Sequence, residues 1–171
     1  MPERHARLTL VLGGARSGKS RHAESIVTTL PPPWVYVATA QPFDDEMRDR
    51  IAAHRARRAA GWITVEAPIE VAGAIDAAVG RPVLVDCLTL WLSNLLLNGS
   101  DITTATDALE TTLNARNAPT VLVANEVGLG IVPDNVLARE FRDQAGLLNQ
   151  RMAAHADSVL FLVAGLPMRA K

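Results

Sequence analysis

Short apolar runs alternate along the chain with longer segments in which apolar residues recur at helical spacing. A continuous run of about four to eight apolar residues is typical of a strand buried on both faces. On this basis we expect strands at residues 8–12, 34–39, 62–66, 82–86, 120–124 and 158–164. The helical segments are expected at residues 20–30, 44–60, 69–79, 88–98, 102–116 and 134–154.

This alternation predicts one α/β domain over residues 1–171, built as a three-layer αβα sandwich around a mostly parallel sheet. Ligands of such sheets bind at the carboxyl ends of the strands. Four stretches that follow predicted strands should therefore share one edge of the sheet. They are residues 13–20, 39–41, 86 and 125–126.

Residues 13–20 read Gly-Gly-Ala-Arg-Ser-Gly-Lys-Ser and fit the P-loop pattern G-x-x-x-x-G-K-[ST] at every fixed position. The pattern lies between a predicted strand and a predicted helix, as a P-loop should. Its glycines let backbone N–H groups surround a phosphate at the positive end of the helix. The pattern predicts a P-loop NTPase-like fold that binds a nucleoside triphosphate, with Lys19 on the β/γ-phosphates and Ser20 on Mg²⁺.

Two carboxylates lie at or just after the carboxyl ends of predicted strands. Asp86 stands where a P-loop protein places the carboxylate that holds Mg²⁺, and it could also cap the helix at 88–98. Glu126 has the analogous position one strand later. It could polarise a nucleophile, orient a water molecule or cap a loop.

Composition narrows the class of protein. The net charge of −1 over 171 residues gives no field that would favour nucleic acid or an anionic membrane. No run reaches the roughly 18 to 20 apolar residues of a membrane span, and the apolar stretch before Gly13 is short for a signal peptide. The single cysteine, Cys87, excludes an intrachain disulfide framework. We therefore expect a cytoplasmic protein without a membrane span.

The predicted helix at 44–60 carries a histidine among arginines. At about 100° per residue, Met47, Arg50, Ile51, His54 and Arg58 fall along one stripe. Neighbouring positive charge favours neutral imidazole, the form that attacks phosphorus. Spacing alone leaves open that this is a solvated basic helix with an incidental histidine.

The chain resembles the bifunctional adenosylcobinamide kinase / adenosylcobinamide-phosphate guanylyltransferase family of cobalamin biosynthesis. The likeness extends over nearly the whole chain and combines the P-loop with R-I-x-x-H at 50–54 and N-E-V-G-x-G-I-V-P at 125–133. Further matching segments lie at residues 38–41, 44–47, 62–66, 85–89, 141–146 and 149–151. Many members of this family carry glutamate where this chain has Asp86.

The resemblance implies two reactions, in which adenosylcobinamide is phosphorylated by ATP or GTP and GMP then passes from GTP to that phosphate. It implies that the transfer runs through a guanylyl-histidine at His54. It also implies a nucleotide site made of Gly13, Gly14, Ala15, Arg16, Ser17, Gly18, Lys19, Ser20, Thr39, Ala40, Gln41, Arg55, Ala56, Arg57, Arg58, Glu66 and Asp86.

Mg²⁺ would be held by Ser20 and Asp86, and the resemblance suggests a homo-oligomer, with a trimer as one form. Two other functions stay open at this point: a monofunctional P-loop kinase that does not use His54, and a nucleotide-dependent switch or ATPase.

Overall fold

The structure is a computed structural model that describes residues 6–58 and 60–171, without the side chains of Arg50, His54 and Arg57. Its strands form one seven-stranded sheet in the order β3-β2-β4-β5-β1-β6-β7. The strands are β1 (Leu8–Gly13), β2 (Trp34–Ala38), β3 (Trp62–Glu66), β4 (Val83–Asp86), β5 (Thr120–Asn125), β6 (Ser158–Val163) and β7 (Leu166–Arg169). The helices are α1 (Lys19–Val27), α2 (Asp45–Arg57), α3 (Val71–Ala77), α4 (Leu88–Leu97), α5 (Ile102–Ala115) and α6 (Val136–His155).

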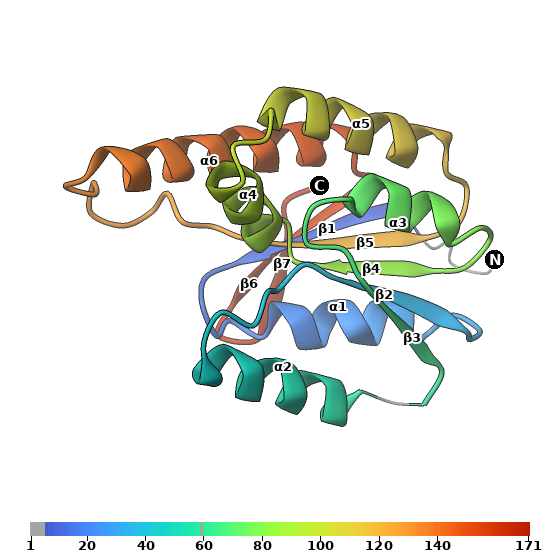
Figure 1. Ribbon diagram of the computed structural model, residues 1–171. Coiled ribbons are helices and arrows are strands. Elements are labelled where there is room, and N and C mark those ends of the chain that lie inside the picture. Colours follow the sequence, from blue (N-terminus) through green and yellow to red (C-terminus); the bar gives the residue numbers. More distant parts are fainter. Residues whose placement is uncertain (1–5, 59) are drawn as a thin grey trace.

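Helices cover both faces of the sheet, which confirms the predicted three-layer architecture (Figure 1). Helices α3 to α6 lie on one face, where the larger apolar core includes Leu10, Val85 and Trp91. Helix α1 lies on the other face with Ala23 and Val27 buried, and α2 lies beyond it on the same side. All strand pairs are parallel except β6 with β7.

Helix α2 differs from the other helices because none of its described side chains is buried. Its start was predicted correctly: the Asp44 carboxylate accepts a hydrogen bond from the Met47 N–H at 2.7 Å, and Asp45 and Glu46 follow in the first turn. Carboxylates there complement the helix dipole. The helix is thus stabilised at its start by this cap, and its described side chains do not belong to the buried core.

The structure corrects one predicted boundary and adds one strand. Helix α1 ends at Val27 and not near residue 30, because residues 28–30 form a turn whose Leu30 N–H bonds to the Val27 carbonyl at 3.0 Å. The strand β7 was not predicted at all. Its four residues are exposed, so the sequence shows no buried apolar run, and it is an edge strand joined to β6 by a tight turn at Ala164 and Gly165.

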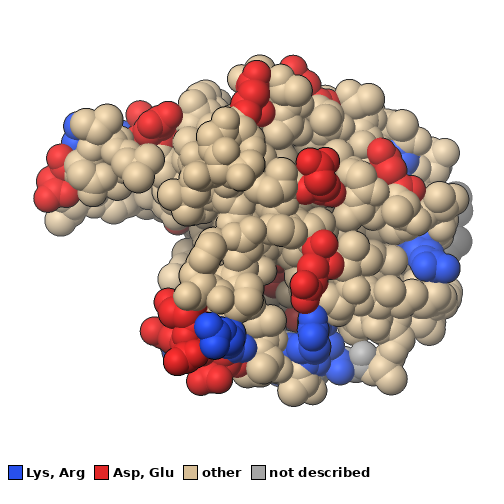
Figure 2. Space-filling model, viewed as in Figure 1, with Lys and Arg blue, Asp and Glu red and all other residues tan. Residues whose placement is uncertain are grey.

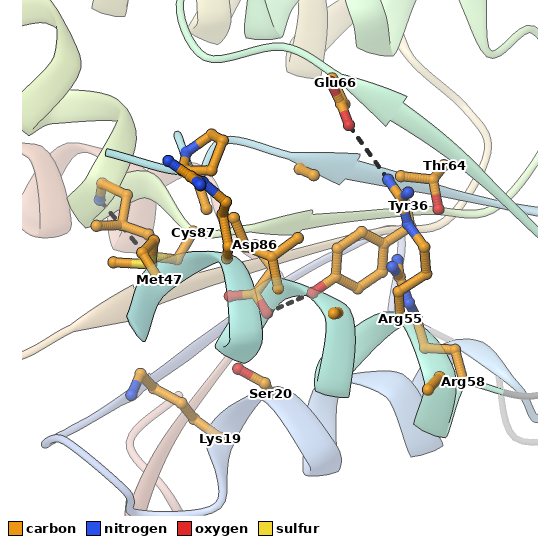
Figure 3. A pocket seen from close by; sticks show the side chains of 18 of the residues that line it. Lys19, Ser20, Tyr36, Met47, Arg55, Arg58, Thr64, Glu66, Asp86 and Cys87 are labelled. Atoms are coloured by element: carbon orange, nitrogen blue, oxygen red, sulfur yellow. Dashed lines mark hydrogen bonds and ion pairs between the residues drawn. The ribbon is translucent and has the colours of Figure 1, made fainter. Parts of the chain in front are cut away.

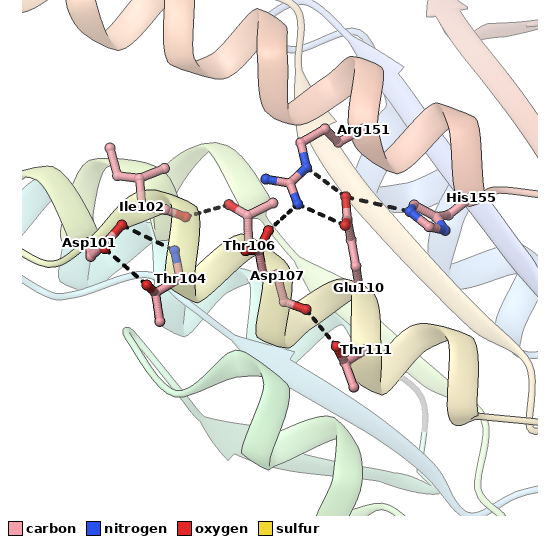
Figure 4. Close-up of polar contacts among 9 residues, drawn as sticks. All are labelled: Asp101, Ile102, Thr104, Thr106, Asp107, Glu110, Thr111, Arg151 and His155. Carbon is pink, nitrogen blue, oxygen red and sulfur yellow. Dashed lines mark hydrogen bonds and ion pairs between the residues drawn. The ribbon is translucent and has the colours of Figure 1, made fainter.

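Helices α5 and α6 are joined by a polar cluster (Figure 4). The Arg151 guanidinium donates to both carboxylate oxygens of Glu110, each at 2.7 Å, and to Asp107. His155 lies 3.5 Å from the Glu110 carboxylate. These bonds hold the pKa of Glu110 below its ordinary value, chiefly through the hydrogen bonds from Arg151.

Charged side chains of both signs are scattered over the face drawn in Figure 2, with carboxylates gathered near the start of α2. This face carries no broad basic patch. None of the helices in residues 6–58 and 60–171 combines the length and apolar character that a membrane span needs.

Candidate functional site

The P-loop has the geometry that its sequence predicts. It leaves β1 at Gly13, and Gly18 precedes the first turn of α1 with φ at 90°, a conformation that favours glycine. A Cβ on Gly13 would lie 2.4 Å from the Ser17 hydroxyl oxygen, so the loop leaves no room for a side chain there. The Lys19 ammonium donates to the Gly14 carbonyl at 3.0 Å, which keeps the lysine folded over the loop.

The turn between β6 and β7 braces the same loop. The Gly165 N–H donates to the Ser17 carbonyl at 2.9 Å, and the Leu162 carbonyl lies beside Gly13. The hairpin that sequence patterns missed is therefore part of the support of the P-loop. The only signal for it was a glycine at position 165, directly after the last predicted strand at residues 158–164.

A pocket of about 720 Å³ opens at the carboxyl ends of the strands, between the P-loop and α2 (Figure 3). It reaches from Asn125 on β5, beside the P-loop, to Thr64 and Glu66 on β3. In the sheet order, β5 and β3 are separated by β4 and β2, which at about 4.8 Å per strand spacing places them about 14 Å apart. A pocket of that length can hold a triphosphate at one end and a base at the other.

Ten of the predicted nucleotide-binding residues line this pocket. They are Ala15, Arg16, Lys19, Ser20, Ala40, Arg55, Ala56, Arg58, Glu66 and Asp86. The strand register explains the convergence, since Ala38 pairs with both Glu66 and Asp86, and Gly13 pairs with Asn125. The predicted common edge of the sheet is thus confirmed.

Other predicted residues are not among those that line the pocket. Gly13 is the last residue of β1, and Gly14, Ser17, Gly18 and Gln41 belong to the surrounding loops.

Thr39 is fully buried. Its hydroxyl donates to the Cys87 carbonyl and accepts from the Cys87 N–H, both at 2.8 Å. The Thr39 side chain therefore joins β2 to the start of α4 and does not face the pocket.

Two predicted residues lie outside what the structure describes. His54 and Arg57 belong to α2, whose Met47, Ile51 and Arg55 line the pocket, but their own side chains are not described. Their roles stay predictions.

Asp86 accepts a hydrogen bond from Tyr36, a residue that the sequence analysis did not single out. The Tyr36 hydroxyl donates to Asp86 Oδ2 at 2.6 Å, and the Arg58 guanidinium lies over the Tyr36 ring, 3.8 Å from its centroid (Figure 3). Burial, followed by the charge of Asp86, raises the pKa of Tyr36 well above its ordinary value, so the phenol stays a donor at neutral pH.

The second predicted role of Asp86, as the cap of α4, is wrong. The N-cap is Cys87, whose Sγ accepts from the Leu90 N–H, and burial raises the pKa of this thiol to about 11. Because the cap comes from Cys87, the Asp86 carboxylate remains on the pocket side of the strand end.

Glu126 has a local role. Its Oε1 accepts from the Gly128 N–H at 2.6 Å, and Glu126 does not line the pocket, whereas Asn125 does. Of the open alternatives for Glu126, the structure supports capping of the loop.

Glu66 and Arg55 face each other across the far end of the pocket, with 3.2 Å between Oε1 and Nη2 (Figure 3). Both side chains are more than half exposed, so this ion pair contributes little to stability. Both remain free to exchange their mutual contact for contacts with a ligand.

The family described as cobinamide kinase / cobinamide phosphate guanyltransferase matches residues 9–170. The chain belongs to this family.

Individual members of the family are similar over almost their whole length. A bifunctional adenosylcobalamin biosynthesis protein of Pseudomonas aeruginosa is 48% identical over 166 residues, which cover 95% of this chain and 96% of the relative. The protein of the same description from Salmonella typhimurium is 42% identical, and the match covers 96% of this chain and 99% of that one. The family resemblance predicted from the motifs is confirmed.

Solved structures support the fold alone. The ATPase EscN of the enteropathogenic E. coli type III secretion system superposes with a TM-score of 0.60 at 11% identity, over 93% of this chain and 43% of that longer chain. A protein of Pyrococcus horikoshii gives a TM-score of 0.54 at 11% identity, over 96% of this chain and 86% of that one. The predicted P-loop NTPase-like α/β fold is thus confirmed.

Proposed function

We propose that this protein is a bifunctional enzyme of cobalamin biosynthesis. It phosphorylates adenosylcobinamide with ATP or GTP, and then transfers GMP from GTP to the adenosylcobinamide phosphate. The observation that carries this proposal is the family match over residues 9–170, on a chain whose P-loop and α2 face one pocket. In a kinase that did not use His54, or in a nucleotide-dependent switch, nothing would require α2 to form a wall of that pocket.

The P-loop end of the pocket would hold the triphosphate. The Lys19 ammonium, now on the Gly14 carbonyl, would move the short distance to the phosphate oxygens. In the kinase reaction the acceptor hydroxyl oxygen bonds to the γ-phosphorus while the bond from that phosphorus to the bridging oxygen breaks. The nucleoside diphosphate leaves, and the hydroxyl proton passes to the product phosphate or to solvent.

The far end of the pocket would hold the nucleoside. The Glu66 carboxylate accepts hydrogen bonds, and guanine offers adjacent N–H donors on one edge. Arg58 supports an anion nearby, because its Nη1 is buried and has no hydrogen-bond partner among the described residues. A guanidinium with an unused donor is well suited to a phosphate oxygen.

The chemistry of the donors fits Mg²⁺. Ser20 and Asp86 both line the pocket, and hydroxyl and carboxylate oxygens are ligands that Mg²⁺ accepts. The described residues contain no group of three or more His, Cys, Asp or Glu that could hold a metal, so the other ligands would be phosphate oxygens and water. When bound, Mg²⁺ neutralises negative charge on the phosphate oxygens.

The guanylyl transfer would use His54 on α2. Its imidazole nitrogen bonds to the α-phosphorus of GTP and pyrophosphate leaves. A phosphate oxygen of the corrinoid substrate then bonds to the same phosphorus and releases the imidazole. The motif R-I-x-x-H, and the position of α2 along the pocket, support this assignment.

The test is incubation with Mg²⁺ and GTP labelled on the α-phosphorus, followed by denaturation. We expect a protein-bound label that is labile in acid and stable in alkali, and we expect His54→Ala to lose it. His155→Ala is the matched control and should keep the label, since His155 lies on α6 in the polar cluster with Glu110. Absence of label in a wild-type protein that binds GTP, or label retained in His54→Ala, would contradict the transferase half.

A product assay separates the three functions. A monofunctional kinase would make adenosylcobinamide phosphate but no guanylylated product, and a switch would hydrolyse nucleotide without changing the corrinoid.

Two further properties are proposed with the function. The protein acts in the cytoplasm, where its single thiol stays reduced. It forms a homo-oligomer, which exposed apolar side chains in the loop after β5 support, with Leu129 82% exposed and Ile131 98% exposed.

A further inference from the structure

Asn125 lines the pocket at its P-loop end and has a side-chain oxygen without a hydrogen-bond partner among the described residues. Its side-chain Oδ1 is buried, and no described residue donates a hydrogen bond to it. A buried acceptor without a donor is costly in a folded protein, so each one in a native structure requires an explanation. A donor that arrives with a ligand is such an explanation, because Asn125 is one of the residues that line the pocket.

The backbone of Asn125 is fixed by two helices. Its N–H donates to the Thr89 hydroxyl of α4 at 2.7 Å, and its carbonyl accepts from the Asn149 amide of α6 at 3.1 Å. Thr89 and Asn149 are both buried. With the backbone groups used in this way, only the side-chain amide of Asn125 is left for a ligand.

The strand register places this amide beside the phosphate end. Asn125 pairs with Gly13, and the next N–H, that of Glu126, donates to the Gly13 carbonyl at 3.1 Å. Asn125 is therefore the polar side chain of β5 next to the P-loop, about 14 Å from the β3 end where the base would lie.

The type of atom selects the ligand group. An amide oxygen accepts hydrogen bonds, so it repels an anionic phosphate oxygen and requires an O–H or N–H donor. The acceptor of the kinase reaction is a hydroxyl, whereas the acceptors of the guanylyl transfer are an imidazole and then a phosphate. Among these acceptors only the hydroxyl carries its hydrogen on the attacking atom itself, so an amide oxygen that accepts this hydrogen also orients the attacking oxygen.

We propose that Asn125 Oδ1 accepts a hydrogen bond from the substrate hydroxyl and orients it for attack on the γ-phosphorus. This proposal rests on the proposed kinase activity. The amide takes no proton, because a carboxamide is not a base at neutral pH; it directs a lone pair of the hydroxyl oxygen toward phosphorus. The bond from that oxygen to the γ-phosphorus forms as the bond to the leaving diphosphate breaks, and the proton ends on the product phosphate or in solvent.

The experiment measures both half-reactions in the wild type, Asn125→Ala and Glu126→Gln. In Asn125→Ala we expect kcat for phosphorylation of adenosylcobinamide to fall about 10- to 100-fold, with nucleotide KM within about twofold. Labelling by GTP carrying an α-phosphorus label should stay within about twofold of the wild type. The melting temperature should not fall, because the deleted oxygen has no partner to lose.

Glu126→Gln serves as a control, and Asn125→Asp tests whether an oxygen acceptor at position 125 is sufficient. Glu126→Gln is the control, since its carbonyl can still accept from the Gly128 N–H, and it should keep both activities. Asn125→Asp keeps an oxygen acceptor at the same place; at saturating nucleotide its kcat should exceed that of Asn125→Ala about tenfold. Its nucleotide KM should rise, because the carboxylate repels the triphosphate.

Each other outcome overturns the proposal. Equal kinase rates in the wild type and Asn125→Ala would show that the amide is not used. A parallel loss of GTP labelling would mean that it holds the nucleotide or a metal-bound water, and an Asp variant as slow as the Ala variant would mean that the amide N–H is the active group. A wild type that does not phosphorylate adenosylcobinamide would instead refute the proposed kinase activity.

Discussion

The hydrogen bond between Tyr36 and Asp86 offers a sharp quantitative test of the site. The substitution Tyr36→Phe removes only the hydroxyl, and the ring keeps its contacts with Arg58 at 3.8 Å and Trp62 at 5.7 Å. The lost bond is short, at 2.6 Å, and its acceptor is a carboxylate, but Asp86 lies at the pocket and can take water in its place. We therefore expect a loss of about 1–2 kcal/mol in the free energy of unfolding.

Removing the acceptor of this hydrogen bond should cost more stability than removing the donor. In Asp86→Ala the phenol of Tyr36, a residue that is 5% exposed, stays inside the protein and loses its acceptor. An unpartnered buried hydroxyl adds its desolvation cost, so we expect a loss of about 2–3 kcal/mol. The double variant removes both groups and should be more stable than the sum of the single losses predicts, by about 1–2 kcal/mol.

The assay is urea unfolding followed by circular dichroism, with thermal melting as a second measure. For a chain of this length, about 1–2 kcal/mol corresponds to a shift in melting temperature of roughly 2–8 °C. As a control, Tyr36→Phe combined with Arg151→Ala should be additive within about 0.5 kcal/mol, because Arg151 bonds residues of α5 on the other side of the sheet. Additive losses for Tyr36 and Asp86 would refute the coupling of the two side chains.

Two further predictions concern stability. Arg116 donates to three backbone carbonyls and to the Thr120 hydroxyl, so Arg116→Ala should lower the free energy of unfolding by about 2–4 kcal/mol, measured in urea. Arg48→Ala, in an exposed ion pair, should cost less than about 0.5 kcal/mol; similar losses for both would contradict this reasoning. The pKa of Glu110 is lowered in the folded state, so its ionised carboxylate stabilises the folded protein. This contribution to the free energy of unfolding is fully present above the unfolded pKa of about 4.3 and is lost as the pH falls through the folded pKa. The free energy of unfolding of the wild type should therefore exceed that of Glu110→Gln at pH 7, and the difference should become smaller in acid. A difference that does not change with pH would contradict a stabilising role of the Glu110 carboxylate.

Most of the sheet could be predicted because buried parallel strands read as continuous apolar runs. The run at Val83–Asp86 and the run at Thr120–Asn125 are of this kind, and the structure has a strand at each. The edge strand β7 has four exposed residues, so burial left no pattern in its sequence. The end of α1 at Val27 was also missed, because the turn that ends it lies before the prolines that appeared to set the limit.

In the candidate site, too, some features could be predicted from the sequence and others could not. The P-loop is one contiguous segment whose geometry depends on its own glycines and on the helix that follows, so the amino-acid sequence by itself determined it. The family motifs pointed to His54, Arg55 and Glu66, but not to Tyr36 or to the role of Asn125. Those two residues matter only through neighbours that are remote in the sequence.

Tertiary structure alone decided which groups meet. The Tyr36 hydroxyl bonds a carboxylate 50 positions away, and the Thr39 hydroxyl is used by the backbone of a residue 48 positions away. Gly165 reaches the P-loop from the far end of the chain. Such contacts depend on strand order and register, which set side chains from separate strands at one edge of the sheet, and no local pattern of apolar and polar residues specifies that order. The sequence determined that a phosphate-binding loop exists; packing determined which side chains surround what it binds.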